Sequence, residues 1–592
     1  MKKLLAILLA VMLLTTGALA ETARTTFEAT AEATAETDGA AHAIDRHEVK
    51  TYLGDLDISY QLPLCFVDGV DDLPWLDLED FCYFMNAFEQ QFYEDVNYSL
   101  TYEAEGDQVW LTRETDYFMA VDFAENTIFF NDYDAFIHDS SNNALVDLVS
   151  ASGYDSDGRG ELFQRQPTGS YDRYGESVLL PLTDYGIQLI HQGDYYLVPA
   201  QTLNDFILAV GTGMNLFYNG EEAFYANSDY FGMVDSANYP LTEMGERYYS
   251  GKTGARSEAL ATYGYNELCL ALDKLYGLKE LHDVTSFDRL FTQLAYKDAL
   301  LSPDPEEADN QLYDFIDLQL DDIHSNFSGY SRLTGKKATE DSYGIQSMNL
   351  NQNYSEYDSM RSQHYPEGPV GYEEVGNTAY VTFDQFTNAD SALYYQCLEN
   401  GEDMPDDTIG LIINAHKQIT RENSPIENVV IDLSLNGGGT LNAAAFTMAW
   451  ALGQAQVSVT DTFTGAMSTA IYAVDTNLDR EFFDGDDLND KKVYCLISPC
   501  SFSCGNFVPA VFKSSGHVTL LGRTSGGGSS LVLNLSTAWG TYFEISGPQR
   551  MSLMKNGAYY DIDQGVEPDF VINNIDHFYD REALTAYING LF

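Results

Sequence analysis

The sequence predicts a mixed α/β protein whose C-terminal part is an α/β domain with parallel strands. Two segments there, residues 429–433 (VVIDL) and 493–497 (VYCLI), are almost continuously apolar, as strands are when helices cover both faces of a sheet. Helical patterns follow these strands, over residues 441–452 and after position 503. Further upstream, short aromatic and β-branched runs broken by Gly, Asp and Asn are typical of strands and hairpins.

The chain divides into segments of distinct composition. They are a signal peptide over residues 1–20, a flexible Ala/Thr/Glu-rich linker over 21–49, a strand-rich N-terminal α+β domain over 50–235, a helical region over 236–345 and a core over 346–592. Within the α+β domain, residues 73–88 and 196–210 each place an apolar edge before a short amphipathic helix, which indicates a duplicated unit. Residues 336–368 are polar and predict a connection without regular structure.

The first residues of the chain have the pattern of a secretory signal peptide. Lys2 and Lys3 precede an apolar run that is short for a bilayer span, and the small residues Ala18 and Ala20 precede the expected cleavage point. We therefore expect the protein to be exported, and secreted or associated with the cell envelope. No membrane insertion is expected once the peptide is removed.

Charge and cysteine content exclude several classes of function. The formal net charge is −61 over 592 residues, and such a field repels nucleic acid and anionic lipid, so no nucleic-acid partner is expected. The seven cysteines form no CxxC pair, and their number is odd, which argues against a disulfide scaffold and a zinc knuckle. Composition does not set the oligomeric state.

A serine between two glycine-rich segments is the strongest chemical signal. Ser503 follows the strand that ends near residue 497 and precedes an apolar helix, so its hydroxyl is expected at a helix N-terminus, where free amides favour a developing anion. The amides of Cys504, Gly437 and Gly438 are candidate donors to an oxyanion. Because a serine in this position is also a common N-cap, a catalytic role requires partners.

A histidine that follows a predicted helix is a candidate partner. Leu312, Phe315, Ile316 and Leu320 fall on one helical face, and this helix leads to His324 within the sequence DIHS (322–325). A histidine at a helix C-terminus can also serve as a cap or a packing residue, because imidazolium is favoured there.

The order of these motifs is similar to that of the S41 serine peptidases. The segments DLSLNGGG, SPCSFSCGNF, LLGRTSGGG and GVEPD follow one another as in that family, and the resemblance covers His324 and roughly residues 372–592. It implies a crotonase-like ββα catalytic core with Ser503 as the nucleophile. It also implies an oxyanion held by the amides of Gly438, or Gly437 beside it, and Cys504.

The resemblance further implies which groups assist Ser503. One branch of the family pairs the serine with a Lys, but the corresponding RTSGGGS segment of this chain has Gly528 and no Lys. The tricorn-like branch uses a His in a D-x-H-[ST] context, which His324 matches as the general base. The family places the acid that orients this base before a GVxPD turn, where Asp561 and Asp563 stand two positions apart, on one face if the segment is a strand; Asp563 is preferred.

The implied function is an exported serine peptidase that hydrolyses a peptide or protein substrate through an acyl-enzyme, without a metal or organic cofactor. The alternatives are a catalytically silent ligand- or peptide-binding protein on the same fold, and an esterase with the same machinery. Where the tricorn peptidase has a Ser directly before its His, this chain has Ile323, and Ser325 is a candidate replacement. Cys504 is a candidate thiol nucleophile by position, but a small buried residue that contributes its amide is the preferred interpretation.

Overall fold

The chain forms two compact units in the computed structural model, which describes residues 41–92, 100–113, 116–138, 162–166, 170–232, 240–327, 332–334, 344–555 and 558–591. The first unit contains Met1–Ser141, Gly175–Gly344 and Val532–Pro548, and the second contains Asn142–Tyr174, Ile345–Leu531 and Gln549–Phe592. The expected signal peptide and most of the expected linker lie outside the described residues. The first strand begins at Ile44, inside the range expected for the linker.

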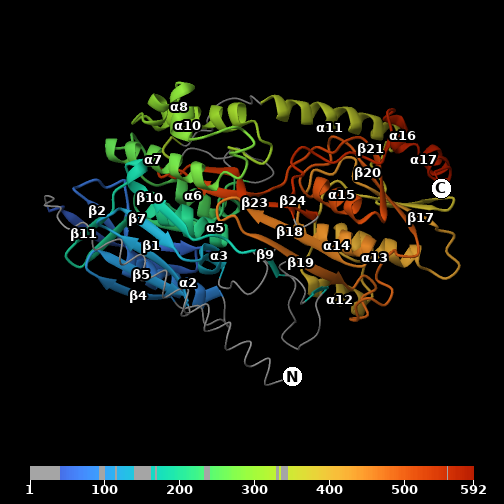
Figure 1. Ribbon diagram of the computed structural model, residues 1–592, viewed down its shortest axis with the longest axis horizontal. Coiled ribbons are helices and arrows are strands. Elements are labelled where there is room, and N and C mark those ends of the chain that lie inside the picture. Colours follow the sequence, from blue (N-terminus) through green and yellow to red (C-terminus); the bar gives the residue numbers. More distant parts are fainter. Residues whose placement is uncertain are drawn as a thin grey trace, which may run out of the picture. The chain divides into compact units, whose positions relative to one another are not determined.

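Two sheets form the framework of the first unit (Figure 1). In order across the seven-stranded sheet, the strands are β11 (Ile190–Gln192), β12 (Tyr195–Pro199), β3 (Trp75–Asp77), β2 (Ser59–Val67), β1 (Ile44–Leu53), β14 (Ala223–Ala226) and β13 (Asn215–Tyr218). In order across the five-stranded antiparallel sheet, they are β10 (Val178–Pro181), β7 (Thr127–Phe130), β6 (Tyr117–Asp122), β5 (Gln108–Arg113) and β4 (Leu100–Glu105).

The helices of the first unit include a helical run that corresponds to the periodic pattern upstream of His324. The helices are α2 (Leu78–Phe92), α3 (Tyr133–His138), η1 (Leu182–Tyr185), α4 (Ala200–Leu203), the π-helical η2 (Asn204–Leu208), α5 (Ala209–Thr212), η3 (Ser228–Tyr230), α6 (Glu243–Tyr249), α7 (Glu258–Leu275), α8 (Phe287–Gln293), α9 (Lys297–Leu300), α10 (Pro305–Tyr313) and the π-helical η4 (Asp314–Leu320). Asp304 caps α10 by accepting the Glu306 N–H. Helix α10 continues directly into η4, which ends at Asp321 in a left-handed conformation (φ 46°, ψ 42°).

The two segments with similar sequence patterns form similar local structures. Strand β3 leads directly into α2, and β12 leads directly into α4 and η2. The two strands are antiparallel neighbours in the seven-stranded sheet, with Leu197 opposite Asp77 and Pro199 opposite Trp75. The apolar edge that the sequence places before each helix is thus a buried strand, and the duplication itself stays a prediction.

A six-stranded sheet forms the centre of the second unit. Its strands, in order, are β15 (Tyr372–Val375), β16 (Thr378–Thr382), β17 (Asn428–Asp432), β20 (Lys492–Ile497), β21 (Val518–Gly522) and β25 (Phe570–Val571). All neighbouring pairs are parallel except β15 with β16. The two apolar segments predicted as strands are therefore the adjacent strands β17 and β20, with Ile431 opposite Cys495.

Helices cover both faces of this sheet, because alternate strand residues point to opposite sides. Ile431 and Cys495 belong to a core shared with α12 (Ser391–Asn400), α13 (Thr408–Ile419), α14 (Leu441–Leu452) and α15 (Cys504–Ser515). Val430 and Tyr494 belong to a second core shared with α11 (Ile345–His364), α16 (Asp576–Tyr579) and α17 (Arg581–Asn589). Figure 1 shows α11, α16 and α17 on one side of the sheet, and α13 and α14 on the other.

A fourth sheet draws strands from distant parts of the sequence. In order, it contains β22 (Ser530–Ser536), β23 (Tyr542–Lys555), β18 (Ala455–Asp461), β19 (Met467–Val474) and β8 (Phe163–Arg165), while β24 (Ala558–Tyr560) pairs with β23 and β9 (Ser170–Arg173) pairs with β19. Strands β8 and β9 come from the range predicted as the N-terminal domain but pair within the second unit. Conversely, Val532–Pro548, which contains most of β22, the following loop and the first half of β23, belongs to the first unit, and Trp539 in this loop is buried.

Helix α11 corrects the expectation of an irregular connection for residues 345–364, while residues 336–343 of the same range lie outside the described residues. It is a 20-residue helix in which Tyr357 and Arg361 are the buried residues. No apolar stripe marks it in the sequence, because its buried side chains are one aromatic ring and one guanidinium group, and Met360 packs against the same core only in part. Within the described ranges, no helix combines the length and apolar character needed to cross a bilayer. The described residues thus form a mixed α/β protein with four sheets, in agreement with the predicted class.

Candidate active site

Ser503 lies at the turn between β20 and α15 in a backbone conformation that few residues other than glycine adopt. Its φ is 56° and its ψ is −123°, and sparsely populated conformations of this kind cost about 1–3 kcal/mol. Its N–H donates to Gly527 O (3.0 Å), and its carbonyl accepts from the Phe507 N–H (2.8 Å). Ser503 occupies the N-cap position of α15, but its side chain forms no capping hydrogen bond, so the hydroxyl is not used to cap the helix.

Gly438 lies against the side chain of Ser503. A Cβ atom added to Gly438 would lie 2.7 Å from Ser503 Cβ and 3.1 Å from Ser503 Oγ, and its φ of 111° favours glycine. Gly437 has more room, since a Cβ added there meets nothing within 4 Å. The structure therefore brings residues 436–440, which we call the glycine loop, next to Ser503.

The two loop amides that the sequence suggested as oxyanion donors have protein acceptors. The Gly437 N–H donates to Asp384 O (3.1 Å), and the Gly438 N–H donates to Oδ1 of Asn436 (2.9 Å). Asn436 is fully buried and shapes the loop through this side-chain bond. The sequence analysis gave Asn436 no role, because an Asn before a glycine indicates only a turn.

Gly439 presents its backbone groups toward the start of α15. On one side of the loop, Phe386 donates its N–H to Gly438 O (2.8 Å) and accepts from the Thr440 N–H (2.8 Å). In an extended segment the N–H and carbonyl of one residue point the same way, so those of Gly439 face away from Phe386. The Gly439 carbonyl accepts from Cys504 Sγ (3.3 Å), which fixes that direction.

Cys504 is the first residue of α15, and its thiol is buried. Burial raises the pKa of its thiol to about 12, so the sulfur is protonated at neutral pH. The amide of the first helical residue has no partner within the helix. The preferred sequence interpretation, a small buried residue beside Ser503, therefore agrees with the structure.

Asp561 and Asp563 follow β24 and lie outside a strand, so the condition for a shared strand face is not met. Asp561 accepts from Arg550 Nη2 (2.8 Å). Asp563 Oδ1 accepts from both the N–H (3.0 Å) and the hydroxyl (2.9 Å) of Ser529. Asp563 is thus bonded to the segment that also accepts the Ser503 N–H.

His324 lies in the first unit, in the turn after η4. The predicted helix ends at Leu320, so His324 follows the helix rather than forming its last turn. Its N–H donates to Asp322 Oδ1 (3.2 Å), and Asp322 Oδ2 accepts from the Ser325 hydroxyl (2.7 Å). The Ser325 hydroxyl also accepts from the Ser546 N–H (3.1 Å), so it stabilises the turn.

The sequence-predicted residues are distributed over both units. Ser503, Cys504, the glycine loop and the two candidate carboxylates belong to the second unit, and His324 belongs to the first. Asp563 is linked to Ser503 through the residues around Gly527, and Gly438 is in van der Waals contact range of the Ser503 side chain. The pairing of His324 with Ser503 stays a prediction.

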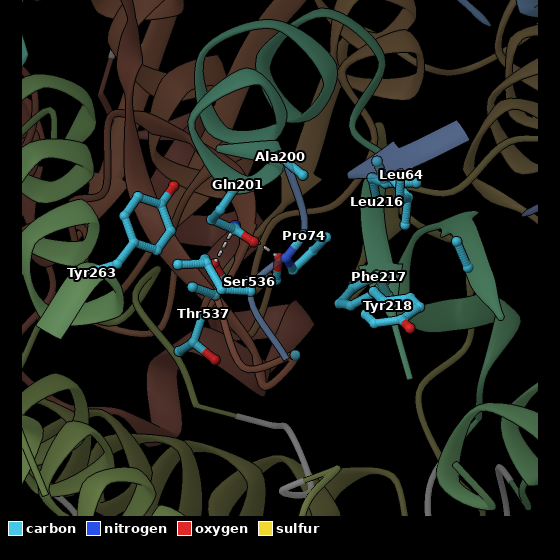
Figure 2. Close-up of a pocket in the computed structure, with 14 residues that line it drawn as sticks. Leu64, Pro74, Ala200, Gln201, Leu216, Phe217, Tyr218, Tyr263, Ser536 and Thr537 are labelled. Atoms are coloured by element: carbon cyan, nitrogen blue, oxygen red, sulfur yellow. Dashed lines mark hydrogen bonds between the residues drawn. The ribbon is translucent and has the colours of Figure 1, made fainter. Parts of the chain in front are cut away.

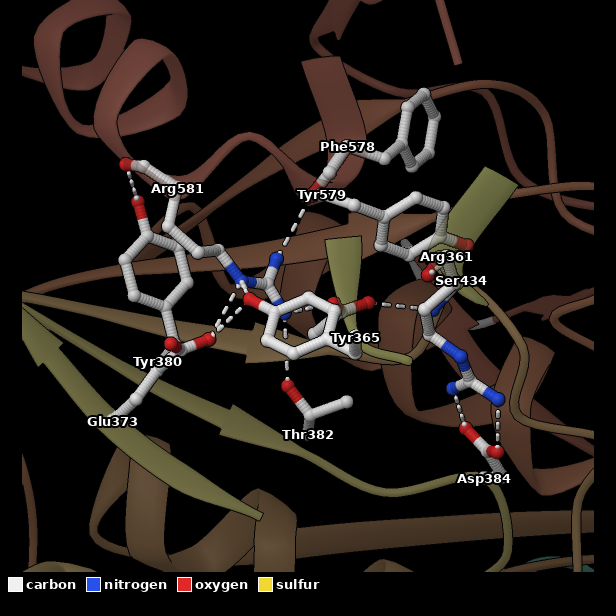
Figure 3. Close-up of polar contacts among 11 residues, drawn as sticks. Arg361, Tyr365, Glu373, Tyr380, Thr382, Asp384, Ser434, Phe578, Tyr579 and Arg581 are labelled. Atoms are coloured by element: carbon white, nitrogen blue, oxygen red, sulfur yellow. Dashed lines mark hydrogen bonds and ion pairs between the residues drawn. The ribbon is translucent and has the colours of Figure 1, made fainter. Parts of the chain in front are cut away.

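Two buried arginines hold the loops at the carboxyl ends of β16 and β17 (Figure 3). Arg581 donates to Asp432 Oδ2 (2.7 Å) and to Thr382 Oγ1 (3.0 Å). Arg361, on α11, donates to both carboxylate oxygens of Asp384 (2.6 and 2.7 Å). Burial lowers the pKa of each guanidinium, but the carboxylate partners raise it by more, so both stay charged. The sequence analysis singled out neither arginine.

The pocket in Figure 2 is lined by residues of the first unit. Gln201 Nε2 donates to both the carbonyl (2.8 Å) and the hydroxyl (3.1 Å) of Ser536 at its edge. The cavity volume is about 20 Å³, which is room for a single water molecule rather than a substrate. In the part of the chain that the structure describes, no three His, Cys, Asp or Glu side chains are grouped so as to hold a metal ion.

Comparison with known proteins identifies a family for part of the chain. Residues 377–572 match the model of peptidase family S41. No curated protein is significantly similar in sequence. Among solved structures, the chain is similar to the photosystem II D1 C-terminal processing protease with a TM-score of 0.24 and 16% identity, over 33% of this chain and 42% of that one, which is less than half of its length.

Two further solved structures are matched over a larger share of their length. Mature CPAF has a TM-score of 0.35 and 11% identity, over 56% of this chain and 96% of that one. A lipoprotein from Streptococcus agalactiae has a TM-score of 0.34 and 11% identity, over 57% of this chain and 96% of that one.

Proposed function

Residues 377–572 are a segment of peptidase family S41, and on this premise we propose that the chain is an exported serine peptidase that cleaves peptide bonds through an acyl-enzyme. The observation that carries the proposal is the backbone of Ser503, a non-glycine residue at φ 56° that begins a helix without capping it. Strain of this kind persists where the surrounding structure enforces it, and a strained turn before a helix exposes a nucleophilic hydroxyl.

The proposed reaction starts with attack of Ser503 Oγ on the carbonyl carbon of the scissile peptide. The Ser503 proton passes to His324, and the carbonyl oxygen becomes an oxyanion. As the tetrahedral intermediate collapses, the C–N bond breaks and His324 returns the proton to the leaving amine. Water then attacks the acyl-enzyme, again with His324 as the base, and releases the carboxylate product and Ser503.

The proposed oxyanion donors are the Cys504 amide and one amide of the glycine loop. The sequence suggested Gly438 or Gly437, whose N–H groups have protein acceptors in this structure. The direction of the Gly439 carbonyl toward Cys504 supports the Gly439 N–H as the second donor. Preorganised donors of this kind contribute about 10²–10³-fold each to kcat in serine peptidases.

We assign the orientation of His324 to Asp563 in preference to Asp561. The carboxylate of Asp561 is already paired with the guanidinium of Arg550. Asp563 accepts hydrogen bonds on Oδ1 from Ser529, a neutral residue, and so keeps its charge for an imidazolium. A carboxylate in this role holds the correct tautomer of the base. A crotonase-like arrangement of the second unit and export after signal cleavage belong to the same proposal.

The test is labelling of the purified protein by a fluorophosphonate probe, with hydrolysis of peptide and short acyl-ester substrates measured in parallel. We expect labelling and peptide hydrolysis by the wild type, and neither by Ser503→Ala. His324→Ala should lower kcat by about 10⁴-fold or more. Labelling that persists in Ser503→Ala would contradict the assignment of the nucleophile.

The alternatives give different results in the same assay. A catalytically silent binding protein would show no labelling by the fluorophosphonate or by the smaller phenylmethylsulfonyl fluoride. An esterase would hydrolyse the acyl esters in a Ser503-dependent way but leave peptides intact.

A further inference from the structure

Helix α11 uses Arg361, one of its few buried side chains, to bind a carboxylate outside the helix; the same guanidinium also donates to Asp358 Oδ1 (3.3 Å), one turn away on α11. Its burial rests on Tyr357 and Arg361. The guanidinium of Arg361 meets both carboxylate oxygens of Asp384 in a fork, with distances of 2.6 and 2.7 Å (Figure 3). Such bidentate pairs fix direction as well as distance, which a lysine ammonium does not do.

Asp384 belongs to a short segment, residues 383–386, that runs along the glycine loop. Asp384 O accepts from the Gly437 N–H (3.1 Å), and Phe383 O accepts from Asn436 Nδ2 (3.1 Å). Phe386 extends the same contact by donating its N–H to Gly438 O (2.8 Å). The segment therefore holds the loop from its start to its end.

The glycine loop depends on such backbone bonds for its position, because glycines have no side chains to pack. On its other side it meets the Ser503 turn, where the Phe502 N–H donates to Asn436 O (3.0 Å). The close approach of Gly438 to Ser503 leaves no room for even a methyl group. A shift of segment 383–386 would therefore move the loop relative to the nucleophile.

We propose that Arg361 is a positioning residue for peptide hydrolysis: through Asp384 and segment 383–386, it holds the glycine loop in register with Ser503. This inference rests on the proposed function for its effect on catalysis. Arg361 touches neither substrate nor Ser503, and it acts through the loop. A polar helix with no apolar stripe thereby controls the geometry of an oxyanion site.

A merely structural ion pair would behave differently from a positioning residue. Removing one partner of a buried pair leaves an uncompensated charge and destabilises the fold, whatever the pair does for catalysis. Removing both charges together avoids that penalty, and apolar replacements of buried pairs are often neutral for stability. The double replacement therefore separates stability from positioning.

The test uses the full chain with Arg361→Lys and with the double variant Arg361→Met/Asp384→Leu. The control is Arg421→Met, because Arg421 also forms a forked ion pair, with Glu374 in the same unit, and that carboxylate lies on β15 away from segment 383–386. The readouts are kcat and KM on a peptide substrate, Tm, and hydrogen exchange of the peptide that covers the glycine loop.

We expect kcat of Arg361→Lys and of the double variant to fall about 10–100-fold, with KM within about threefold of the wild-type value. The reason is that a displacement of about 1 Å in an active site costs up to about 10²-fold in rate. Exchange of the glycine-loop amides should accelerate in the same variants. The control should keep kcat, KM and loop exchange at wild-type values.

A folded Arg361→Lys or double variant with unchanged kcat and unchanged loop exchange would overturn the proposal. If the wild type shows no Ser503-dependent hydrolysis but the Arg361 variants exchange their glycine-loop amides faster than the wild type does, the role of Arg361 in holding the loop is supported and the proposed function is rejected. The two ideas can therefore fail separately.

Discussion

Replacing Gly438 by alanine would place a methyl group into the side chain of Ser503. The added Cβ would lie 2.7 Å from Ser503 Cβ, closer than non-bonded carbons approach, and 3.1 Å from Ser503 Oγ. The residue would also have to adopt a φ of 111°, which L side chains rarely do. Either the glycine loop or the serine turn must then move.

The expected cost has two parts of similar size. Backbone strain contributes about 1–3 kcal/mol, and overpacking of a filled site contributes about 1–3 kcal/mol. The free energy of unfolding should therefore fall by about 2–6 kcal/mol, which corresponds to a decrease in Tm of roughly 5–20 °C. We expect kcat to fall by about 10²-fold or more, because the methyl group displaces the hydroxyl or blocks its approach to substrate.

Gly437→Ala is the matched control in the same loop. A Cβ there meets nothing within 4 Å, its φ is not positive, and the substitution keeps the amide that donates to Asp384. Its Tm and kcat should stay close to those of the wild type, since unconstrained substitutions change stability by about 0.5 kcal/mol or less. Thermal melting and hydrolysis kinetics check both variants. Equal behaviour of the two alanine variants would refute the assigned geometry of the loop.

Two further predictions concern a thiol and a carboxyl group whose pKa values are raised by burial. Burial raises the pKa of the Cys504 thiol to about 12, so the wild-type protein should resist alkylation by iodoacetamide. Cys504→Ser should keep kcat within about threefold of the wild-type value. Rapid alkylation with loss of activity would contradict this. Burial also raises the pKa of Glu267 to about 7 from an ordinary value of 4.5, so the folded state binds this proton more tightly than the unfolded state. Its contribution therefore lowers stability as pH rises from 4.5 through 7, by at most about 3 kcal/mol. The Tm of Glu267→Gln minus that of the wild type should therefore be larger at pH 8 than at pH 5. A difference in Tm that does not change with pH would contradict the assignment.

The elements around Ser503 are predictable because their burial leaves a pattern in the sequence. Residues 441–452 predict α14 at its observed bounds, and two apolar runs predict β17 and β20 to within a residue at each end. Strands covered on both faces consist of consecutive apolar residues, and few other elements do so at that length. The same strands place Ser503 at the start of α15, where the sequence predicts it.

The residues that shape the glycine loop are not predictable in this way. Arg361 and Asn436 act through hydrogen bonds to residues 383–386, and each bond pairs segments that are distant in the sequence. No local periodicity encodes such a pairing. Helix α11 was missed for the same reason, because an ion pair and one aromatic ring replace the apolar stripe that predicts an amphipathic helix.

The two candidate acids, Asp561 and Asp563, show a different limit of prediction from sequence. The spacing of Asp561 and Asp563 would place both on one face of a strand, but β24 ends at Tyr560. Both acids therefore lie beyond the strand, and they bond to different residues. Asp561 accepts a hydrogen bond from Arg550, whereas Asp563 accepts one from Ser529. Strand ends depend on pairing with β23, which the sequence of the turn itself does not record.

The buried position of Trp539 constrains any dissection of this protein into independent modules. Its indole N–H donates to Asp309 Oδ1 (2.7 Å), its ring faces the Arg256 guanidinium at 4.2 Å, and a methyl at Gly264 would touch it at 3.0 Å. All three partners precede residue 377, yet Trp539 lies inside the stretch that matches the peptidase family. A fragment cut at the edges of that match would carry an uncovered indole into water and would tend to aggregate. A stable fragment that contains Trp539 must therefore also contain helices α7 and α10, which carry Gly264 and Asp309.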